Sequence, residues 1–182
     1  MNRSSRGRVL SGARAIALVG ITAATVECAK LALSALPNIE IVTLLLALYG
    51  YVFGWYGVLS AVVFVSIEPL IYGFGTWVVA YYIHWPLVAV VFMILARIKL
   101  KNRWLITAAA IVLTFFFGVL SSLVDVGLLS GNFENFLYRF GVYYARGIVF
   151  YALQIGCNAV LFPLCFKFLA ERLCRIRAQF FR

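Results

Sequence analysis

The sequence predicts an all-α integral membrane protein with six transmembrane helices. Of its 182 residues, 65% are apolar and only 12% are charged, whereas an average soluble domain has about 25% charged residues. The mean hydropathy is +1.01, and a soluble fold of this composition would expose large apolar patches. Each span needs about 20 residues, so six spans use nearly the whole chain. We therefore expect one membrane domain, residues 1–182, with no soluble catalytic domain.

Six apolar runs define the expected spans. Pro37 interrupts the chain after the first run, Gly50, Gly54 and Gly57 loosen the connection between the second and third, Gly73 and Gly75 follow the third, and polar segments separate the rest. The second run has about 15 residues, which is short for a span, so we expect it to lean on its neighbours or to form one irregular unit with the third. The spans are expected at Val9–Leu36, Ile39–Phe53, Trp55–Tyr72, Trp77–Ala96, Trp104–Val124 and Tyr138–Ala170.

The positions of the basic residues predict the orientation of the bundle. Thirteen of the sixteen Lys and Arg residues would lie on one side of a six-span chain, and the positive-inside rule makes that side the cytoplasm. An even number of spans then places both termini in the cytoplasm, while Asp125 and Glu134 flank the fifth-to-sixth connection on the other side. The three basic groups are Arg3, Arg6, Arg8 and Arg14; Arg97, Lys99, Lys101 and Arg103; and Lys167, Arg172, Arg175, Arg177 and Arg182.

The N-terminal run also has the basic and apolar order of a signal peptide. Its apolar stretch continues to Leu36, well beyond a signal-peptide core of about 7–15 residues. We therefore expect the first helix to be retained as a span.

The sequence carries no pattern typical of an enzyme. A phosphate-binding P-loop needs a Lys followed by Ser or Thr, and none of the four lysines has such a neighbour. His84 is the single histidine, which excludes an H-E-x-x-H zinc site, and no C-x-x-C pair or G-x-S-x-G elbow occurs. We expect no enzymatic activity, no cofactor, no metal site and no nucleic-acid partner.

Charged residues within the outer halves of the spans are the candidate binding residues. Each costs about 2.5–3.5 kcal/mol on insertion into hydrocarbon, so their placement is informative. Glu27 and Lys30 lie one helical turn apart on one face of the first span, and Glu68 lies in the outer half of the third. Together with nearby polar and aromatic side chains they would line a cup that opens outwards, as in a small-molecule site. The candidate substrate-binding residues are Glu27, Lys30, Asn38, Glu40, Glu68, Tyr72, Trp77, Tyr81, Tyr82, His84, Trp85, Arg139, Tyr143 and Arg146.

Each of these features also has a simpler explanation. The Trp and Tyr residues could form the ordinary aromatic belt at the membrane interface. Glu27 and Lys30 could be an ion pair within one helix, and His84 could be a hydrogen-bonded interfacial residue. Three acidic and three basic groups at membrane depth on one side nevertheless favour a binding site over anchoring alone.

Small residues mark two candidate helix-packing faces. Ala13 and Ala17 form a small-x-x-x-small pair at the inner end of the first span, and Gly20 continues it outwards. Gly50 and Gly54 repeat the spacing near the second-to-third turn. Such faces permit either close packing within the bundle or docking on another membrane subunit.

The chain combines a cytoplasmic start, the Ala13 and Ala17 pair in the first span and six spans in 182 residues, and its segment from Pro37 to Trp85 contains the strings PNIEIVTLLLALYG, EPLIYGFGTW and YYIHWP. Over nearly its whole length the chain resembles an S-component, the substrate-binding subunit of an energy-coupling factor (ECF) transporter. The three strings resemble a subgroup of S-components that includes cobalamin-specific members. The resemblance implies an S-component-like bundle in the bacterial plasma membrane, a vitamin site in the outer half, and docking of Ala13 and Ala17 on a transmembrane scaffold subunit. It also implies two separate ATPase subunits as the energy source.

Cobalamin is the first substrate expected from this likeness, because its corrin ring and nucleotide offer apolar faces and amide edges to a ring-lined cup. Nothing in the spacing or charge of the residues selects one vitamin. The first-to-second connection is short here, whereas many S-components have a sizeable gate in that position.

Two other functional classes fit parts of the sequence. A structural membrane protein, similar to the small multi-span factor of the cell-shape machinery, would explain the small-residue faces and the basic inner surface. An ion-coupled carrier that works alone would explain Glu27 and Glu68.

Overall fold

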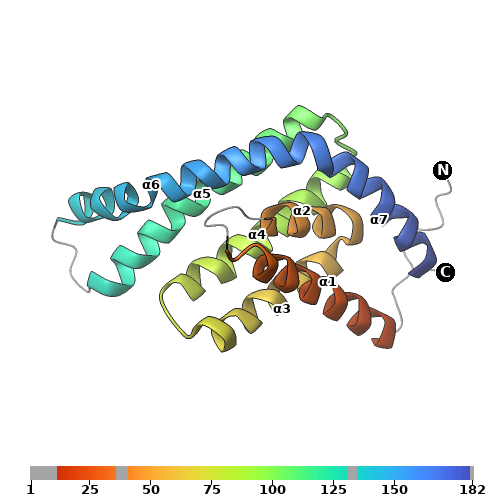
Figure 1. The fold of residues 1–182 in the computed structure, drawn as a ribbon, viewed down its shortest axis with the longest axis horizontal. Coiled ribbons are helices and arrows are strands. Elements are labelled where there is room, and N and C mark those ends of the chain that lie inside the picture. Colours follow the sequence, from red (N-terminus) through yellow and green to blue (C-terminus); the bar gives the residue numbers. More distant parts are fainter. Residues whose placement is uncertain (1–11, 36–40, 131–134, 181–182) are drawn as a thin grey trace.

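The computed structural model describes residues 12–35, 41–130 and 135–180, and every regular element in these ranges is a helix (Figure 1). Five described helices are long and apolar enough to cross a membrane, and α2 is a shorter apolar helix. The structure therefore agrees with an all-α, multi-pass membrane protein. The elements are α1 (Gly12–Ala32), α2 (Val42–Phe53), α3 (Trp55–Tyr72), α4 (Trp77–Arg97), α5 (Arg103–Ser130), α6 (Phe136–Leu161), the π-helical turn η2 (Phe162–Phe166) and α7 (Lys167–Phe180).

The short helix α2 lies at the centre of the bundle. Ten of its twelve residues are buried, and it packs against α1, α3, α4 and α7 (Figure 1). Twelve residues give a helix about 18 Å long, which is well short of the roughly 30 Å of a bilayer core. The expectation that the second apolar run leans on its neighbours is thus confirmed, and the neighbours cover almost its whole surface.

Glycines allow the helices around α2 to approach it closely. A Cβ atom on Gly50 would lie 2.1 Å from the backbone oxygen of Ala89 in α4, and one on Gly57 would lie 2.3 Å from the backbone oxygen of Tyr49. Gly54 is the single residue between α2 and α3, and its φ of 64° is readily adopted only by glycine. Gly50 and Gly54 therefore serve packing and turning within the chain.

Side-chain hydrogen bonds join three segments at one end of the bundle. The Tyr51 hydroxyl donates to the backbone oxygen of Leu100, in the α4–α5 connection, at 2.9 Å. Arg177 of α7 donates to the backbone oxygen of Val52 at 2.8 Å. The basic residues of 97–103 and of α7 consequently gather at the end where α2 finishes.

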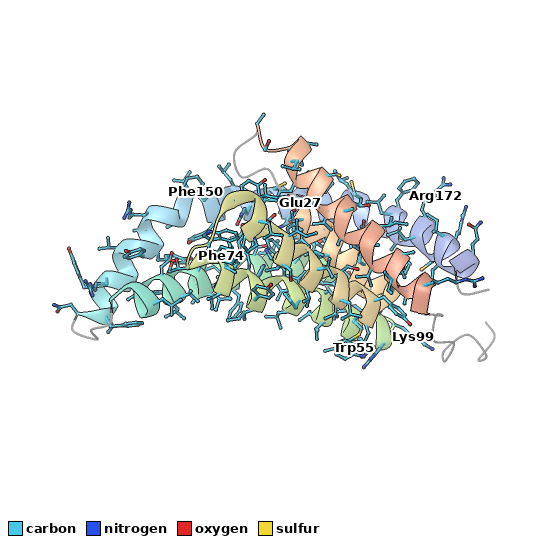
Figure 2. The ribbon with its side chains drawn as sticks, turned by 90° about the horizontal axis from the view of Figure 1, so that it is seen from below. Glu27, Trp55, Phe74, Lys99, Phe150 and Arg172 are labelled. Atoms are coloured by element: carbon cyan, nitrogen blue, oxygen red, sulfur yellow. The ribbon has the colours of Figure 1, made fainter. Side chains whose placement is uncertain are left out.

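The opposite end holds the α3–α4 connection. Thr76, at the start of α4, donates a hydrogen bond to Asp125 near the end of α5. Figure 2 shows Lys99 and Arg172 toward one end of the molecule and Phe74 well away from them, nearer the middle of its length. The described connections thus alternate between ends, as expected for successive crossings. Arg3, Arg6, Arg8, Glu134 and Arg182 lie outside the described residues.

The last two apolar runs form longer helices than predicted. Helix α5 extends to Ser130 and therefore contains Asp125, and the last helix continues from Phe136 to Phe180 through η2. At about 1.5 Å per residue this helix is more than twice as long as a bilayer core is thick. Figure 1 shows α5 and α6 side by side, extending beyond the group formed by α1 to α4.

The π-helical turn η2 separates α6 from the basic, amphipathic helix α7. Pro163 lies within η2, and proline has no backbone N–H to donate to the preceding turn. After the turn, α7 buries Ala170 and packs Leu173 against the core, while Arg172 and Arg175 are exposed. The predicted end of the sixth span at residue 170 therefore falls inside a continuing basic, amphipathic helix.

Candidate functional site

Helices α1 and α3 run parallel and are joined by two polar contacts. The hydroxyl oxygens of Thr22 and Ser60 lie 2.6 Å apart, and both residues are buried. Eight residues further along each helix, Lys30 forms an ion pair with Glu68. Eight residues correspond to about 12 Å of helix, so the hydroxyl pair and the ion pair belong to the same register of α1 against α3.

Aromatic rings from α3 and α4 surround the Lys30 ammonium group. Its Nζ lies 4.4 Å from the ring centroid of Tyr72, 5.6 Å from that of Tyr81 and 5.9 Å from that of Phe64. These distances are within the range of cation–π attraction. The Glu68 side chain is 1% exposed and that of Lys30 is 27% exposed. The ion pair is therefore covered on the Glu68 side and reaches the surface on the Lys30 side.

Glu27 is the third charged member of this group. It lies one turn before Lys30, is buried, and is close enough to interact electrostatically with both Glu68 and Lys30. Among the described residues, neither Glu27 oxygen has a hydrogen-bond partner, and the Oε1 atom of Glu68 has none either. The hydrogen-bonded ion pair of Lys30 is thus with Glu68 and not within α1. We refer to Glu27, Lys30 and Glu68, with the rings of Phe64, Tyr72 and Tyr81, as the Lys30 cluster.

A line of rings continues inwards from the Lys30 cluster along α4. The ring centroids of Trp77 and Tyr81 are 5.0 Å apart and those of Tyr81 and Trp85 are 5.6 Å apart. His84 is fully buried, with its ring 4.8 Å from the rings of both Trp85 and Phe117. Within the described part of the chain, the Trp85 Nε1 and His84 Nδ1 atoms have no hydrogen-bond partner.

The structure therefore brings together most of the predicted binding residues of α1, α3 and α4. These are Glu27, Lys30, Glu68, Tyr72, Trp77, Tyr81, His84 and Trp85. Sequence reasoning missed Phe64 and Phe117, because a Phe in an apolar span carries no signal of its own. The position of Phe64 one turn before Glu68 on the same helix was the available hint.

The remaining predicted residues do not join the Lys30 cluster. Tyr82 is exposed and makes a 2.8 Å hydrogen bond with Ser66 on the outer surface. Arg139 and Arg146 are exposed on α6, and Tyr143 lies between them, where α6 packs along α5. The predicted contribution of the sixth span to the cup is not found, because α5 is longer than expected and carries the start of α6 away from α1 and α3. Asn38 and Glu40 lie outside the described residues.

The small-residue face of α1 is uncovered by the described part of the chain. Ala13, Ala17 and Gly20 are exposed, and a Cβ atom on Gly20 would meet nothing within 4 Å. Ile16 and Ile21 beside them are 76% and 59% exposed. These small residues therefore do not serve packing among the described helices.

No family model, curated protein or solved structure matches the chain. In the described ranges, no three His, Cys, Asp or Glu side chains gather in a way that could hold a metal ion. The Lys30 cluster and the exposed face of α1 are therefore the two features of the chain that bear on its function.

Proposed function

We propose that the protein is the membrane-embedded substrate-binding subunit of an ECF-type vitamin transporter. The observation that supports this most is the Lys30 cluster, in which charged groups and rings from three helices converge within an apolar bundle. Charged groups at membrane depth are costly and mark functional sites by default. Convergent polar groups within aromatic walls are the usual composition of a small-molecule site.

The position of the cluster favours access from outside the cell. Lys30 lies near the end of α1, and Glu68 lies one turn before the end of α3. The basic residues of 97–103 and of α7 gather at the opposite end, which the positive-inside rule assigns to the cytoplasm. A ligand would thus be captured from the outer side.

Energy would come from partner subunits. Ala13 and Ala17, with Gly20, offer an exposed face of small side chains that a helix of a scaffold subunit could approach closely. Two ATPase subunits would drive rotation of this subunit in the membrane, so that the ligand is released inside. Cobalamin is the first vitamin to test, on the resemblance of the segment from Pro37 to Trp85.

The proposal is tested by purifying the full chain in lipid nanodiscs and measuring vitamin binding by isothermal titration calorimetry. We expect binding without nucleotide, because capture needs no ATP. We also expect an affinity-tagged chain to co-purify from its native membrane with a larger membrane subunit and two ATPases. Absence of affinity for every vitamin tested would overturn the proposal.

An ion-coupled carrier is a second candidate, and Glu27 is the observation that favours it. A buried carboxylate without a hydrogen-bond partner among the described residues, next to a second carboxylate, is suited to bind and release a proton. Uptake that persists after deletion of the partner ATPases and collapses with the proton gradient would favour this candidate over the first.

A further inference from the structure

The Lys30 cluster has more negative than positive charge. Glu27 and Glu68 are both more than nine-tenths buried, and Lys30 is the one cation that the structure places against them among the described residues. Counted formally, the three groups carry a net charge of −1. Isolated charge of this kind is expensive in a medium of low dielectric constant, so the cluster is suited to accept one further positive charge, either a proton on Glu27 or the cationic group of a ligand.

The cluster also has more hydrogen-bond acceptors than donors. Lys30 donates to the Oε2 atom of Glu68, which leaves both oxygens of Glu27 and the Oε1 atom of Glu68 without a donor within the described residues. Carboxylate oxygens accept hydrogen bonds and donate none when ionised. When both carboxylates are ionised, the missing partner is a group with N–H or O–H donors, and a proton on Glu27 would itself supply one such donor to Glu68.

The surrounding rings favour the same kind of partner. Phe64, Tyr72 and Tyr81 already stand around one ammonium group, and the faces of such rings attract cations. Tyr72 is 48% exposed, so the edge of the cluster opens to the surface beside Lys30.

We propose that the ligand is an organic ammonium compound whose cationic nitrogen binds beside Lys30, donating to Glu27 and to the free oxygen of Glu68. This inference rests on the proposed function for its physiological meaning, because it names the class of vitamin that the transporter would take, and it favours a vitamin with an ammonium group over cobalamin. An anionic vitamin would instead need Lys30 as its partner, and a neutral one would leave the charge of the cluster unbalanced.

The first experiment compares vitamins of different charge on the purified chain in nanodiscs. The probes are pyridoxamine as the ammonium compound, thiamine as a cation whose charged nitrogen has no N–H donor, pyridoxine and cyanocobalamin as neutral compounds, and biotin as an anion. Pyridoxamine and pyridoxine differ by an ammonium in place of a hydroxyl group, so their ratio isolates the charge. We expect the tightest binding from pyridoxamine, which should bind at least about tenfold more tightly than pyridoxine.

Two substitutions test whether the ligand is a cation or an anion, because they should change the binding affinities of the two kinds of ligand differently. Glu27→Gln keeps the shape and removes one negative charge, so it should weaken binding of the cation about tenfold. Lys30→Ala removes the competing cation and should tighten that binding, whereas it would abolish binding of an anion. Glu171→Gln and Lys167→Ala, on the exposed side of α7, are the matched controls and should change neither affinity.

A second experiment tests the cluster independently of transport. In Lys30→Ala, n-propylammonium chloride replaces the atoms that were removed, so it should raise the thermal stability of the variant. Equal concentrations of 1-propanol or sodium chloride should not do so, and Lys167→Ala should not respond to the amine.

The outcomes separate the two proposals. Tightest binding by cyanocobalamin or biotin would support vitamin transport and overturn the ammonium inference. No vitamin binding would overturn the transport proposal, and rescue by n-propylammonium would then show that a free ammonium group binds at the two carboxylates in the position of the Lys30 side chain. No vitamin binding and no rescue would overturn both. If Lys30→Ala does not fold, the vitamin panel and the Glu27→Gln variant decide the question.

Discussion

The close contact between α2 and α4 predicts that Gly50→Ala destabilises the bundle. The added Cβ atom would lie 2.1 Å from the backbone oxygen of Ala89, whereas ordinary contact begins at 3.4 Å. The two backbones would have to separate by about 1.3 Å, the difference between these distances. The atoms in contact belong to the backbone of Ala89, so no flexible side chain can move aside instead. Such a shift loses packing along the α2–α4 interface and costs about 3 kcal/mol. The better helix propensity of alanine returns about 1 kcal/mol, which leaves about 2 kcal/mol of destabilisation.

The prediction is measured by thermal unfolding of the detergent-solubilised protein, followed by size-exclusion chromatography of the remaining monomer. A loss of about 2 kcal/mol corresponds to a fall of about 4–8 °C in the midpoint for a chain of this size. Gly156→Ala is the matched control, because a Cβ atom there meets nothing within 4 Å and only the gain in helix propensity remains. A Gly50→Ala variant as stable as the Gly156→Ala variant would refute the packing argument.

Three further predictions follow from other parts of the molecule. Glu68→Ala should abolish vitamin binding while leaving complex assembly intact. Arg146→Ala should leave both binding and assembly unchanged, because Arg146 is exposed on α6, away from the Lys30 cluster. Equal loss of binding in the two variants would contradict this prediction. Gly20→Leu should block co-purification of partner subunits without lowering the stability of the isolated chain, and unchanged co-purification would show that this face is not the docking surface. Asn158→Ala should lower stability by about 1–3 kcal/mol, because buried Asn158 donates to Thr114 at 2.9 Å; thermal unfolding that matches the wild type would show that this bond contributes nothing.

Apolar runs and glycine positions predicted the helices and the central turn, because both depend on local chemistry. The start of α3 at Trp55 and the single-residue turn at Gly54 follow directly from the sequence. The extension of α5 to Ser130 does not, since the stretch beyond Val124 is polar enough at Asp125 to suggest a loop. That carboxylate is accommodated within the helix by its hydrogen bond from Thr76, a contact between distant segments that local pattern cannot reveal.

The candidate site was predictable on α1, α3 and α4 and not on α6. Helical periodicity placed Glu27 and Lys30 on one face, and the depth of Glu68 in its span placed it at the same level. Lys30 pairs with Glu68 because of the register of α1 against α3, and Thr22 and Ser60 are in contact in that same register. Arg146 lies outside the Lys30 cluster because the long helix α5 places the start of α6 away from α1 and α3. That placement depends on tertiary packing.

The burial of α2 has a consequence for biogenesis. At twelve residues, α2 is too short to be recognised and released into lipid as a span by itself. Gly54 joins it directly to α3, so the pair would leave the translocon as one helical hairpin. Because ten of its residues are buried by neighbouring helices, α2 can reach its final environment only after α4 has been synthesised. Until then its apolar surface needs a lipid or chaperone partner, which makes the interval between α2 and α4 the vulnerable stage of membrane insertion.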